Sequence, residues 1–367
     1  MKAEYTEQDI NNINELKTFL DEEKIEYIQD TLTIDFPNGW QVLEEVFYMN
    51  EGNLEVRYVN SWMHKQDNSK RFGEIQMGIP KDYFGSLTKE YHEKGKRIIW
   101  VKDYEITECK DIITPEGQEI KGYRRKWEVL KSYICCATHH IHHRIYARDT
   151  EVCEISGAEA RSFLEYACFY GFRGASHTFV LKLKKDKEGL KKGTILMLFS
   201  VGMNFYGNKN CETNGVKVEV IRVGTLPNYQ IIGGSSKLLT YFLEKYPTIS
   251  VNRQGGYEDV PVKTVVFYVD ADHNDSRSLY TLGYDHVGYD ILGFHNYAAK
   301  DIDIDKLKVK KGNVFQRKPQ IHKKIMELMS TGHIVAIGTA GTDVFTLDRD
   351  KYLEKLHENK EKKSNMK

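Results

Sequence analysis

A glycine- and serine-rich segment carries the residues of clearest chemical potential. It reads Gln230-Ile-Ile-Gly233-Gly234-Ser235-Ser236-Lys237, after a strand expected over residues 216–223 and at the start of a helix expected over residues 235–246. Glycines let a backbone approach a ligand closely, and the first turn of a helix offers unpaired N–H groups and a positive dipole end. The segment therefore predicts an anion-binding loop. A plain glycine-rich helix start with serine as N-cap is the structural alternative.

A second segment follows the next expected strand, residues 264–270. It begins at Asn274 and contains Leu279-Tyr280-Thr-Leu282-Gly283-Tyr284. Gln-x-x-Gly-x-Ser ahead of the first helix resembles the pyrophosphate loop of GNAT-type N-acyltransferases. The second segment follows it along the chain, as in that family, and resembles the helix after the loop. The resemblance implies an acyl-CoA or a related acyl donor, bound by Gln230, Gly233, Gly234, Ser235, Ser236 and Lys237.

The same resemblance assigns roles in catalysis. It implies that the acyl group lies where the strands at residues 216–223 and 264–270 splay apart. Tyr280 is then the candidate acid that protonates the leaving thiolate, and Glu219 or Asp270 is the candidate base. Core packing with a satisfied hydroxyl is the alternative interpretation of Tyr280.

A wider resemblance runs in patches from about residue 24 to residue 347. Glu219-Val-Ile-Arg222, Tyr268-Val-Asp270 and the two segments above are similar to a phage family in which a Vsr-like nuclease domain precedes a GNAT-like domain related to the Mom DNA-modification protein. Such proteins are often described as homing endonucleases, and the resemblance implies DNA as a partner. The chain departs from the family at Ala271-Asp272-His273, where Arg-Arg-Trp is usual, and at Cys168, where the family has histidine.

The nuclease half of this resemblance implies a metal site. A Vsr-like nuclease needs clustered carboxylates and a histidine that hold Mg²⁺ and activate water. Glu45, Glu55 and His64 are the candidates, but the strand position at which the family carries glutamate is most simply Arg57. A cation there repels Mg²⁺. The sequence therefore predicts a decayed site, and Mg²⁺ is expected only if the chain is an active nuclease.

Cysteines and histidines are concentrated in residues 135–143, at the end of a helix expected over residues 127–143. On that helix Cys135, His139 and His142 share one face at i, i+4 and i+7, which is chemically adequate for Zn²⁺. A single helix rarely supplies a whole tetrahedral site, so an amphipathic helix with exposed histidines and buried thiols is the favoured interpretation. The chain has six cysteines and no C-x-x-C pair, which predicts free thiols.

Composition narrows the class of protein. Hydrophobic residues make up 40% of the chain and charged residues 29%, a normal globular mixture. Lys+Arg and Asp+Glu both number 53, which argues against a strongly basic DNA-coating protein but allows a local basic face. There is no run of about 18 apolar residues and no apolar N-terminal signal. We therefore expect no membrane partner and a cytoplasmic location, in the host if a phage encodes the protein.

The apolar patterns predict an α+β fold of two domains in the 367 residues. We expect a degenerate nuclease-like domain over residues 1–148, with a Vsr/PD-(D/E)XK-like mixed sheet and helices. A GNAT-like domain with a mixed sheet flanked by helices is expected over residues 149–350, and a charged flexible tail over residues 351–367. The second domain should open with a helix over residues 158–169, because Ser156 and Glu159 form a capping-box pattern.

Three functional hypotheses follow. The first is an acyltransferase-like enzyme that modifies nucleic acid bases, with the nuclease-like domain positioning DNA. The second is a homing-type endonuclease in which Glu45, Glu55 and His64 gather Mg²⁺. The third is a catalytically inactive DNA- or protein-binding protein that keeps both folds. The first is favoured because its sequence blocks are intact, whereas the nuclease carboxylates are incomplete.

Overall fold

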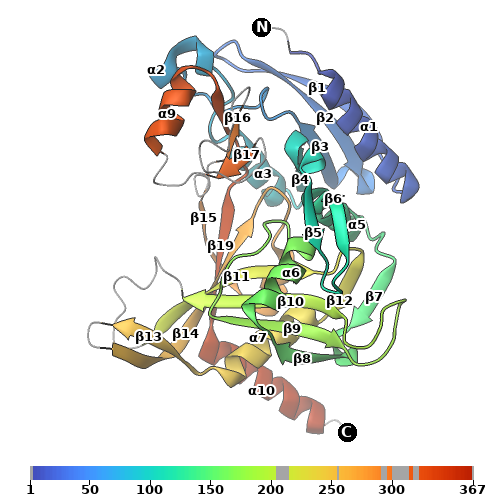
Figure 1. Cartoon of the computed structure of the whole chain (residues 1–367), viewed down its shortest axis with the longest axis vertical. Coiled ribbons are helices and arrows are strands. Elements are labelled where there is room, and N and C mark those ends of the chain that lie inside the picture. The colour runs from blue at the N-terminus through green and yellow to red at the C-terminus, as the bar shows by residue number, and fades with distance from the viewer. Residues whose placement is uncertain are drawn as a thin grey trace.

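Two large sheets with helices on their faces organise the chain (Figure 1). The computed structural model describes residues 3–203, 215–253, 256–290, 296–299, 314–316 and 322–365. The expected mixed α+β class is confirmed. None of the helices in these residues combines the length and the apolar composition needed to span a bilayer.

The first sheet has the order β1-β2-β3-β4. Its strands are β1 (Ile28–Asp35), β2 (Gln41–Met49), β3 (Leu54–Val59) and β4 (Arg97–Lys102). The first three strands run antiparallel, and β4 runs parallel to β3. A parallel neighbour needs a crossover, and α3 (Tyr83–Glu93) supplies it.

Helices cover both faces of this sheet. On one face lie α1 (Glu7–Glu22), α4 (Asp103–Thr107) and α5 (Arg125–Ala137). Helix α1 begins with a capping box between Thr6 and Asp9, and its apolar residues at helical spacing pack into the same core as Trp127 of α5. On the other face, Phe84 of α3 packs edge-to-face on Trp100 of β4, with ring centroids 4.6 Å apart.

The second sheet follows the path β15-β19-β14-β11-β10-β9-β8, and β13 pairs with β14. The strands are β8 (Thr150–Glu154), β9 (His177–Leu183), β10 (Ile195–Met203), β11 (Val216–Thr225), β13 (Thr248–Arg253), β14 (Gly256–Asp270), β15 (Asp285–Asp290) and β19 (Thr342–Asp348). Strands β11 and β14 run parallel, and every other pair in the described part of this sheet is antiparallel.

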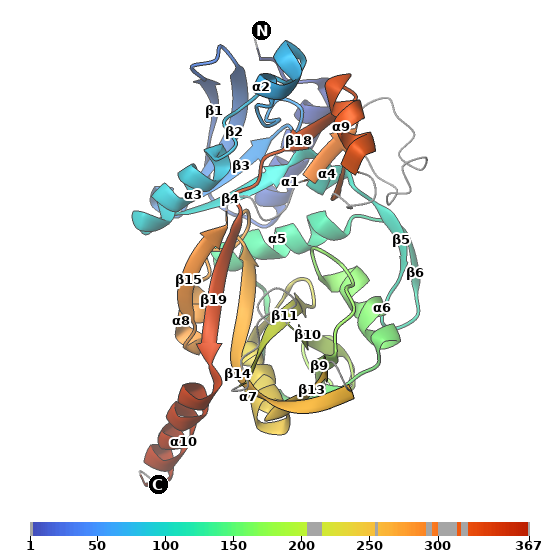
Figure 2. The same cartoon turned by 90° about the vertical axis from the view of Figure 1, so that its left-hand side faces the viewer.

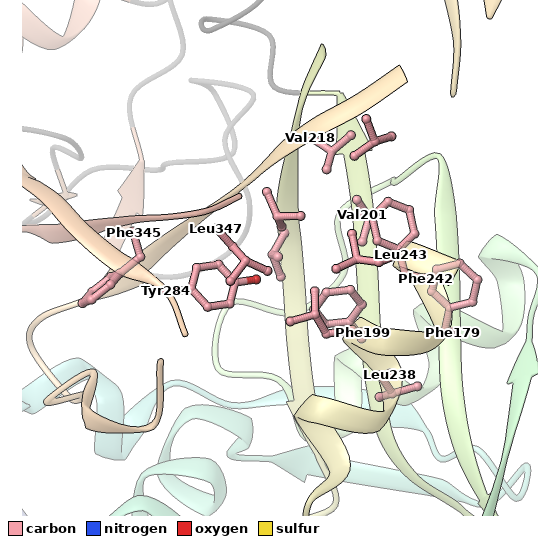
Figure 3. Packing of buried hydrophobic residues seen from close by; sticks show 14 of the residues in the cluster. Phe179, Phe199, Val201, Val218, Leu238, Phe242, Leu243, Tyr284, Phe345 and Leu347 are labelled. Atoms are coloured by element: carbon pink, nitrogen blue, oxygen red, sulfur yellow. The ribbon is translucent and has the colours of Figure 1, made fainter. Parts of the chain in front are cut away.

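Helix α6 (Gly157–Ala167) covers one face of the second sheet and starts at the expected capping box of Ser156 and Glu159. Helix α7 (Gly234–Lys245) covers the other face, together with α8 (Arg277–Leu282). Figure 3 shows this second core: Phe242 and Leu238 of α7 meet strand residues such as Phe179. The alternation of the strands therefore sets which side chains face α6 and which face α7.

Smaller elements connect and extend the two sheets. They are β5 (Lys110–Ile113), β6 (Glu119–Tyr123), β7 (His143–Tyr146), β12 (Tyr229–Ile232), β16 (Asn296–Ala299), β17 (Val314–Gln316), β18 (Ile334–Ile337), α2 (Ser69–Phe72), α9 (His322–Ser330) and the 3₁₀ turns η1 (Asn50–Gly52), η2 (Gly73–Gln76) and η3 (Ala147–Asp149). Figure 2 shows α9 and β18 beside the first sheet. There the Gln76 amide donates to the carbonyls of Met329 (2.7 Å) and Ile334 (3.0 Å).

The C-terminal segment, which its charge predicts to be a flexible tail, has regular secondary structure. It forms helix α10 (Arg349–Asn365), and Tyr352 and Leu353 pack against the core beneath α7. The hydroxyls of Tyr352 and Thr240 lie 2.9 Å apart. These apolar contacts hold the beginning of a helix whose remaining turns are highly charged.

Candidate functional site

Glu55, one of the two expected nuclease carboxylates, lies with Glu44 in a buried cluster around an arginine. Arg57 of β3 donates to Glu44 (Nη1, 2.7 Å) and to Glu55 (Nε, 2.8 Å; Nη2, 2.6 Å). Tyr83 donates to Glu44 and Tyr91 donates to Glu55, at 2.8 and 2.7 Å. The guanidinium thus lies between the two carboxylates at the distances of charge-assisted hydrogen bonds. It takes up the oxygen atoms that a divalent cation would need.

Glu44 rather than Glu45 belongs to this cluster, which corrects the expected grouping. The imidazole Nε2 of His64 lies 3.3 Å from Glu44. Burial raises the pKa of Glu44, but His64 and Arg57 outweigh burial and lower it below its ordinary value. Glu45 points to the opposite face of β2, where Gln29 and Thr31 donate to it at 2.6 and 2.8 Å. Adjacent strand residues face opposite sides, so only one of the two glutamates can join Glu55 and His64.

The predicted face of Cys135, His139 and His142 does not form. Helix α5 ends at Ala137, and His139 has a left-handed backbone with φ of 64°. His142 instead pairs with Glu23 of the loop after α1, at 2.8 Å. Among the described residues, no group of three or more His, Cys, Asp and Glu side chains is arranged to hold a metal ion. The thiols within the described ranges are free, as expected; Cys211 lies outside them.

The predicted anion-binding loop is part strand and part helix. Gln230 belongs to β12, which pairs in parallel with β7. Gly233 is the exposed N-cap residue of α7 with φ of 77°, a conformation that favours glycine. Gly234 is buried, and a Cβ there would lie 2.7 Å from the sulfur of Met197. The two positions therefore favour glycine for different reasons: backbone conformation at Gly233 and close packing at Gly234.

The two serines and the lysine of this loop have different surroundings. Ser235 and Ser236 are half-buried in its first turn. The ammonium group of Lys237 donates to the carbonyls of Ala147 (2.8 Å) and Thr150 (2.5 Å), so it is held by η3 and the start of β8. Burial lowers the pKa of Lys237. The loop thus offers backbone N–H groups and two hydroxyls, while its lysine serves the protein's own backbone.

Strands β11 and β14 diverge at their carboxyl ends. Their parallel pairing runs from Val216 and Val262 to Val220 and Phe267. Beyond that point β11 pairs only with β10, through a register shift, and β14 pairs with β19. Glu219 lies just before the divergence, on the face opposite Val218 and Val220, which pack under α7.

Glu219 is half-buried on the α6 side of the sheet. Burial raises its pKa above the ordinary value, and the charges of Arg173 and Arg222 oppose that shift only in part. A carboxylate with a raised pKa is a stronger base near neutral pH, which suits general base chemistry.

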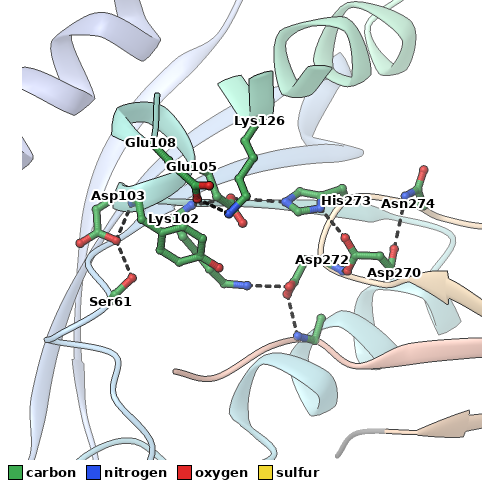
Figure 4. A network of polar contacts seen from close by, with 12 residues as sticks. Ser61, Lys102, Asp103, Glu105, Glu108, Lys126, Asp270, Asp272, His273 and Asn274 are labelled. Atoms are coloured by element: carbon green, nitrogen blue, oxygen red, sulfur yellow. Dashed lines mark hydrogen bonds and ion pairs between the residues drawn. The ribbon is translucent and has the colours of Figure 1, made fainter. Parts of the chain in front are cut away.

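Asp270, the other candidate base, lies in a buried network that joins the two sheets (Figure 4). Its carboxylate lies 2.6 Å from Nδ1 of His273, whose Nε2 lies 3.4 Å from Glu105 of α4. Lys102 at the end of β4 donates to Asp272 at 2.6 Å. Burial opposes ionisation of Asp270, but His273 outweighs it and lowers the Asp270 pKa to about 2. A carboxylate with so low a pKa is a poor proton acceptor.

Tyr280 lies away from Glu219, the candidate base on β11. Its ring packs edge-to-face on Phe345 of β19, with centroids 5.3 Å apart, and 57% of the residue is exposed. Phe345 pairs with Phe267, so Tyr280 lies on the side of β14 away from β11. Glu219 faces α6, whereas Phe345 belongs to the core under α7. The structure therefore does not bring Tyr280 and Glu219 together on one face.

The structure brings Tyr170 to the diverging strands, a residue that the sequence analysis missed. Burial and the nearby charge of Asp270 on β14 raise the pKa of Tyr170, and its ring lies 5.8 Å from the guanidinium carbon of Arg222 on β11. The residue is 41% exposed. Tyr170 follows α6 in a loop without a recognisable motif. Arg222 appeared in the sequence only as part of a resemblance, and its guanidinium binds the carbonyls of Gly171 and Ile221.

Comparisons with known proteins add no family to this picture. No protein-family model matches the chain, and no curated protein matches it significantly. The class established here is a mixed α+β protein with two main sheets.

Proposed function

We propose that this chain is an acyltransferase-like enzyme that transfers an acyl group to a nucleic acid base. The observation that carries the proposal is the end of the β11–β14 ladder at Val220 and Phe267, beside Glu219. Beyond these residues β11 and β14 no longer pair with each other, and we place an extended donor between them. One parallel pair with antiparallel neighbours on both sides is also compatible with the GNAT-like resemblance.

The beginning of α7 is the proposed site for the donor's phosphates. This helix has 12 residues, and Gly233 at its N-cap leaves the first turn without a covering side chain. Backbone N–H groups there, with the hydroxyls of Ser235 and Ser236, would bind the anion. Lys237 takes no part, because its ammonium group is bound to backbone carbonyls. When bound, the donor supplies an activated acyl group.

Glu219 is the proposed base in this reaction. It would accept the proton that the acceptor amine loses as its nitrogen forms a bond to the acyl carbon. Tyr170 and Arg222 lie beside the diverging strands. Arg222 uses two of its five N–H donors on backbone carbonyls, so its other donors, with the Tyr170 hydroxyl, would stabilise the charge that develops on the acyl oxygen and the leaving thiolate. Burial, with the charges of Asp270 and Asp272, holds the pKa of Tyr170 well above its ordinary value, so its hydroxyl keeps a proton to donate.

The first sheet has a positioning role in this proposal. Arg57 neutralises the two carboxylates that a nuclease would use for Mg²⁺, so the sheet would contribute DNA contacts rather than cleavage. DNA as the partner rests on the resemblance to the phage family.

Acyl-donor binding tests the proposal, measured by calorimetry with acetyl-CoA and by its effect on the melting temperature. Gly233→Asp places a carboxylate where the phosphates should bind, whereas Gly233→Asn imposes the same backbone strain without charge. We expect Gly233→Asp to weaken binding by about tenfold or more relative to Gly233→Asn. Equal affinities of the two variants, or no binding by the wild-type protein, would contradict the proposal.

A second measurement separates the alternatives. The proposal predicts a mass increase in nucleosides from DNA that is co-expressed with the wild-type protein but not with Glu219→Gln. Mg²⁺-dependent DNA cleavage that disappears in Glu44→Ala would instead support the endonuclease hypothesis. Absence of both activities would favour a DNA- or protein-binding role.

A further inference from the structure

A cavity of about 370 Å³ lies between the two sheets, on the side of β14 away from the proposed acyl site. One wall is α3 and the loop after it, and the other is formed by α8, β15 and β19. Ligand cavities in proteins typically measure roughly 300–1,000 Å³, so this one can hold a small organic molecule. None of its lining residues belongs to β11 or to the first turn of α7.

Aromatic rings form the apolar part of the lining. Tyr280 stands 57% exposed with its edge-to-face partner Phe345 beside it, and Tyr289 of β15 lines the same space. An exposed tyrosine ring in a concave site is a stacking surface for another planar ring. The lining thus favours a flat, aromatic ligand over an aliphatic one.

Two polar atoms in the lining are buried without a hydrogen-bond partner. They are Nε2 of His92 on α3 and the hydroxyl oxygen of Tyr289. Burial lowers the pKa of His92, so its ring is neutral near pH 7 and offers one donor and one acceptor nitrogen. Buried polar atoms are normally paired. Turned toward the cavity, the two atoms would fit a ligand whose ring has hydrogen-bonding groups on its edge.

The rim of the cavity carries charges of both signs, and its carboxylates lie beside basic side chains. Asp343 interacts with His286 at 2.9 Å, and Asp275 is shared between Arg277 (3.2 Å) and Arg97 (3.9 Å). Lys89 is exposed and lies 3.9 Å from Glu93, which also lines the cavity, a surface pair that contributes little, and Lys96 is half-buried. These lysines can bind an anionic group that projects from the cavity, at little desolvation penalty.

We propose that this cavity binds a nucleotide, with the base stacked on Tyr280 and its polar edge at His92 and Tyr289. The phosphate would lie at the rim beside Lys89 and Lys96. Together, the three observations favour a ligand that has a planar ring, a polar edge and an attached anion. The nucleotide can be free in solution or part of a DNA single strand. The site is separate from the acyl-donor site and does not depend on it.

Titration calorimetry on the full chain tests this assignment. The probes are the four 5′-deoxynucleoside monophosphates, inorganic phosphate, and a short single-stranded oligodeoxynucleotide. We expect at least one mononucleotide to bind saturably and inorganic phosphate not to bind. Tyr280→Ala should weaken nucleotide binding by about 5- to 100-fold, because it removes the stacking surface. Tyr289→Phe, which loses only the hydroxyl, should weaken it by about 3- to 10-fold.

Matched variants locate the effect. Tyr257→Ala removes a tyrosine that is 78% exposed at the start of β14, remote from the cavity, and should bind as the wild type does. Gly233→Asp should also leave nucleotide affinity unchanged, which separates this site from the acyl-donor site. If the oligonucleotide binds more tightly than the mononucleotides, and Tyr280→Ala loses this binding to the same extent, the natural ligand is a DNA single strand. Absence of binding at millimolar nucleotide, or equal affinity of Tyr280→Ala and the wild type, would overturn the proposal.

Discussion

A single guanidinium determines what the buried carboxylates of the first sheet can do. Arg57 bonds to Glu44 and Glu55 through three of its donor contacts, and all three side chains are almost fully buried. Removing one partner of a buried ion pair leaves an uncompensated charge in a medium of low polarity. The arginine is therefore a structural requirement of the site as it stands.

Replacement of this arginine gives a stability prediction. We expect Arg57→Met to lower the free energy of unfolding by about 3–5 kcal/mol, measured by urea denaturation at pH 7. Lys94→Met is the matched control, because Lys94 and Glu90 form an exposed pair at 2.5 Å. Its effect should stay below about 1 kcal/mol. Similar losses in the two variants would show that the Arg57 cluster contributes no more than a surface pair.

Among the elements, α7 combines a ligand-binding position with a packing constraint. Its N-cap glycine is exposed and left-handed, but the next glycine is pressed against Met197, Ile231 and Leu181. The proposed donor site therefore depends on how closely the helix can approach β10 and β12. A side chain at Gly234 would push the first turn of the helix away from the sheet.

Alanine at two helix-starting glycines tests this packing. Gly234→Ala should destabilise the protein by about 1–3 kcal/mol, because its Cβ would meet the sulfur of Met197 at 2.7 Å. Gly157→Ala, at the first residue of α6, meets nothing within 4 Å and should be neutral or slightly stabilising. Thermal denaturation of both variants measures the difference. A loss in Gly157→Ala as large as that in Gly234→Ala would argue against the packing explanation.

At the scale of the whole molecule, the buried network of Figure 4 ties the first sheet to the second. It contains the cations Lys102 and His273 and the carboxylates Glu105, Asp270 and Asp272. Burial lowers the pKa of His273, but Asp270 and Glu105 outweigh burial and raise it to about 10. The imidazole is therefore charged at neutral pH, between two carboxylates from different parts of the chain.

This pKa predicts how stability depends on pH. The folded protein holds the His273 proton up to about pH 10, whereas the unfolded chain releases it near the ordinary value of 6.5. The contribution of His273 to stability is complete below about pH 6.5 and disappears as the pH rises through 10. We expect the free energy of unfolding of the wild type to fall more steeply between pH 7 and pH 10 than that of His273→Gln. His142→Gln, at an exposed histidine, should keep the wild-type slope; equal slopes for all three proteins would contradict the assignment.

Local patterns predicted several elements correctly. The capping box of Ser156 and Glu159 begins α6, and the strand expected over residues 216–223 appears as β11. Such patterns depend only on neighbouring residues, so they can be recognised without knowing which elements pack against them. The helix expected to reach residue 143 ends at Ala137, because the histidines after it are drawn into a turn and into β7. Here the pairing of β7 with β12 overrides helical spacing.

The sequence by itself determined the α+β class, the glycine-rich start of α7 and the presence of an arginine among the carboxylates of the first sheet. Only the tertiary structure decided which of these residues meet. Glu44 rather than Glu45 joins Glu55, since the choice depends on which face of β2 the rest of the fold covers. His273 meets Glu105 across 168 residues of chain. Residue types and short spacings are encoded locally, but contacts between distant segments follow from how the two sheets pack.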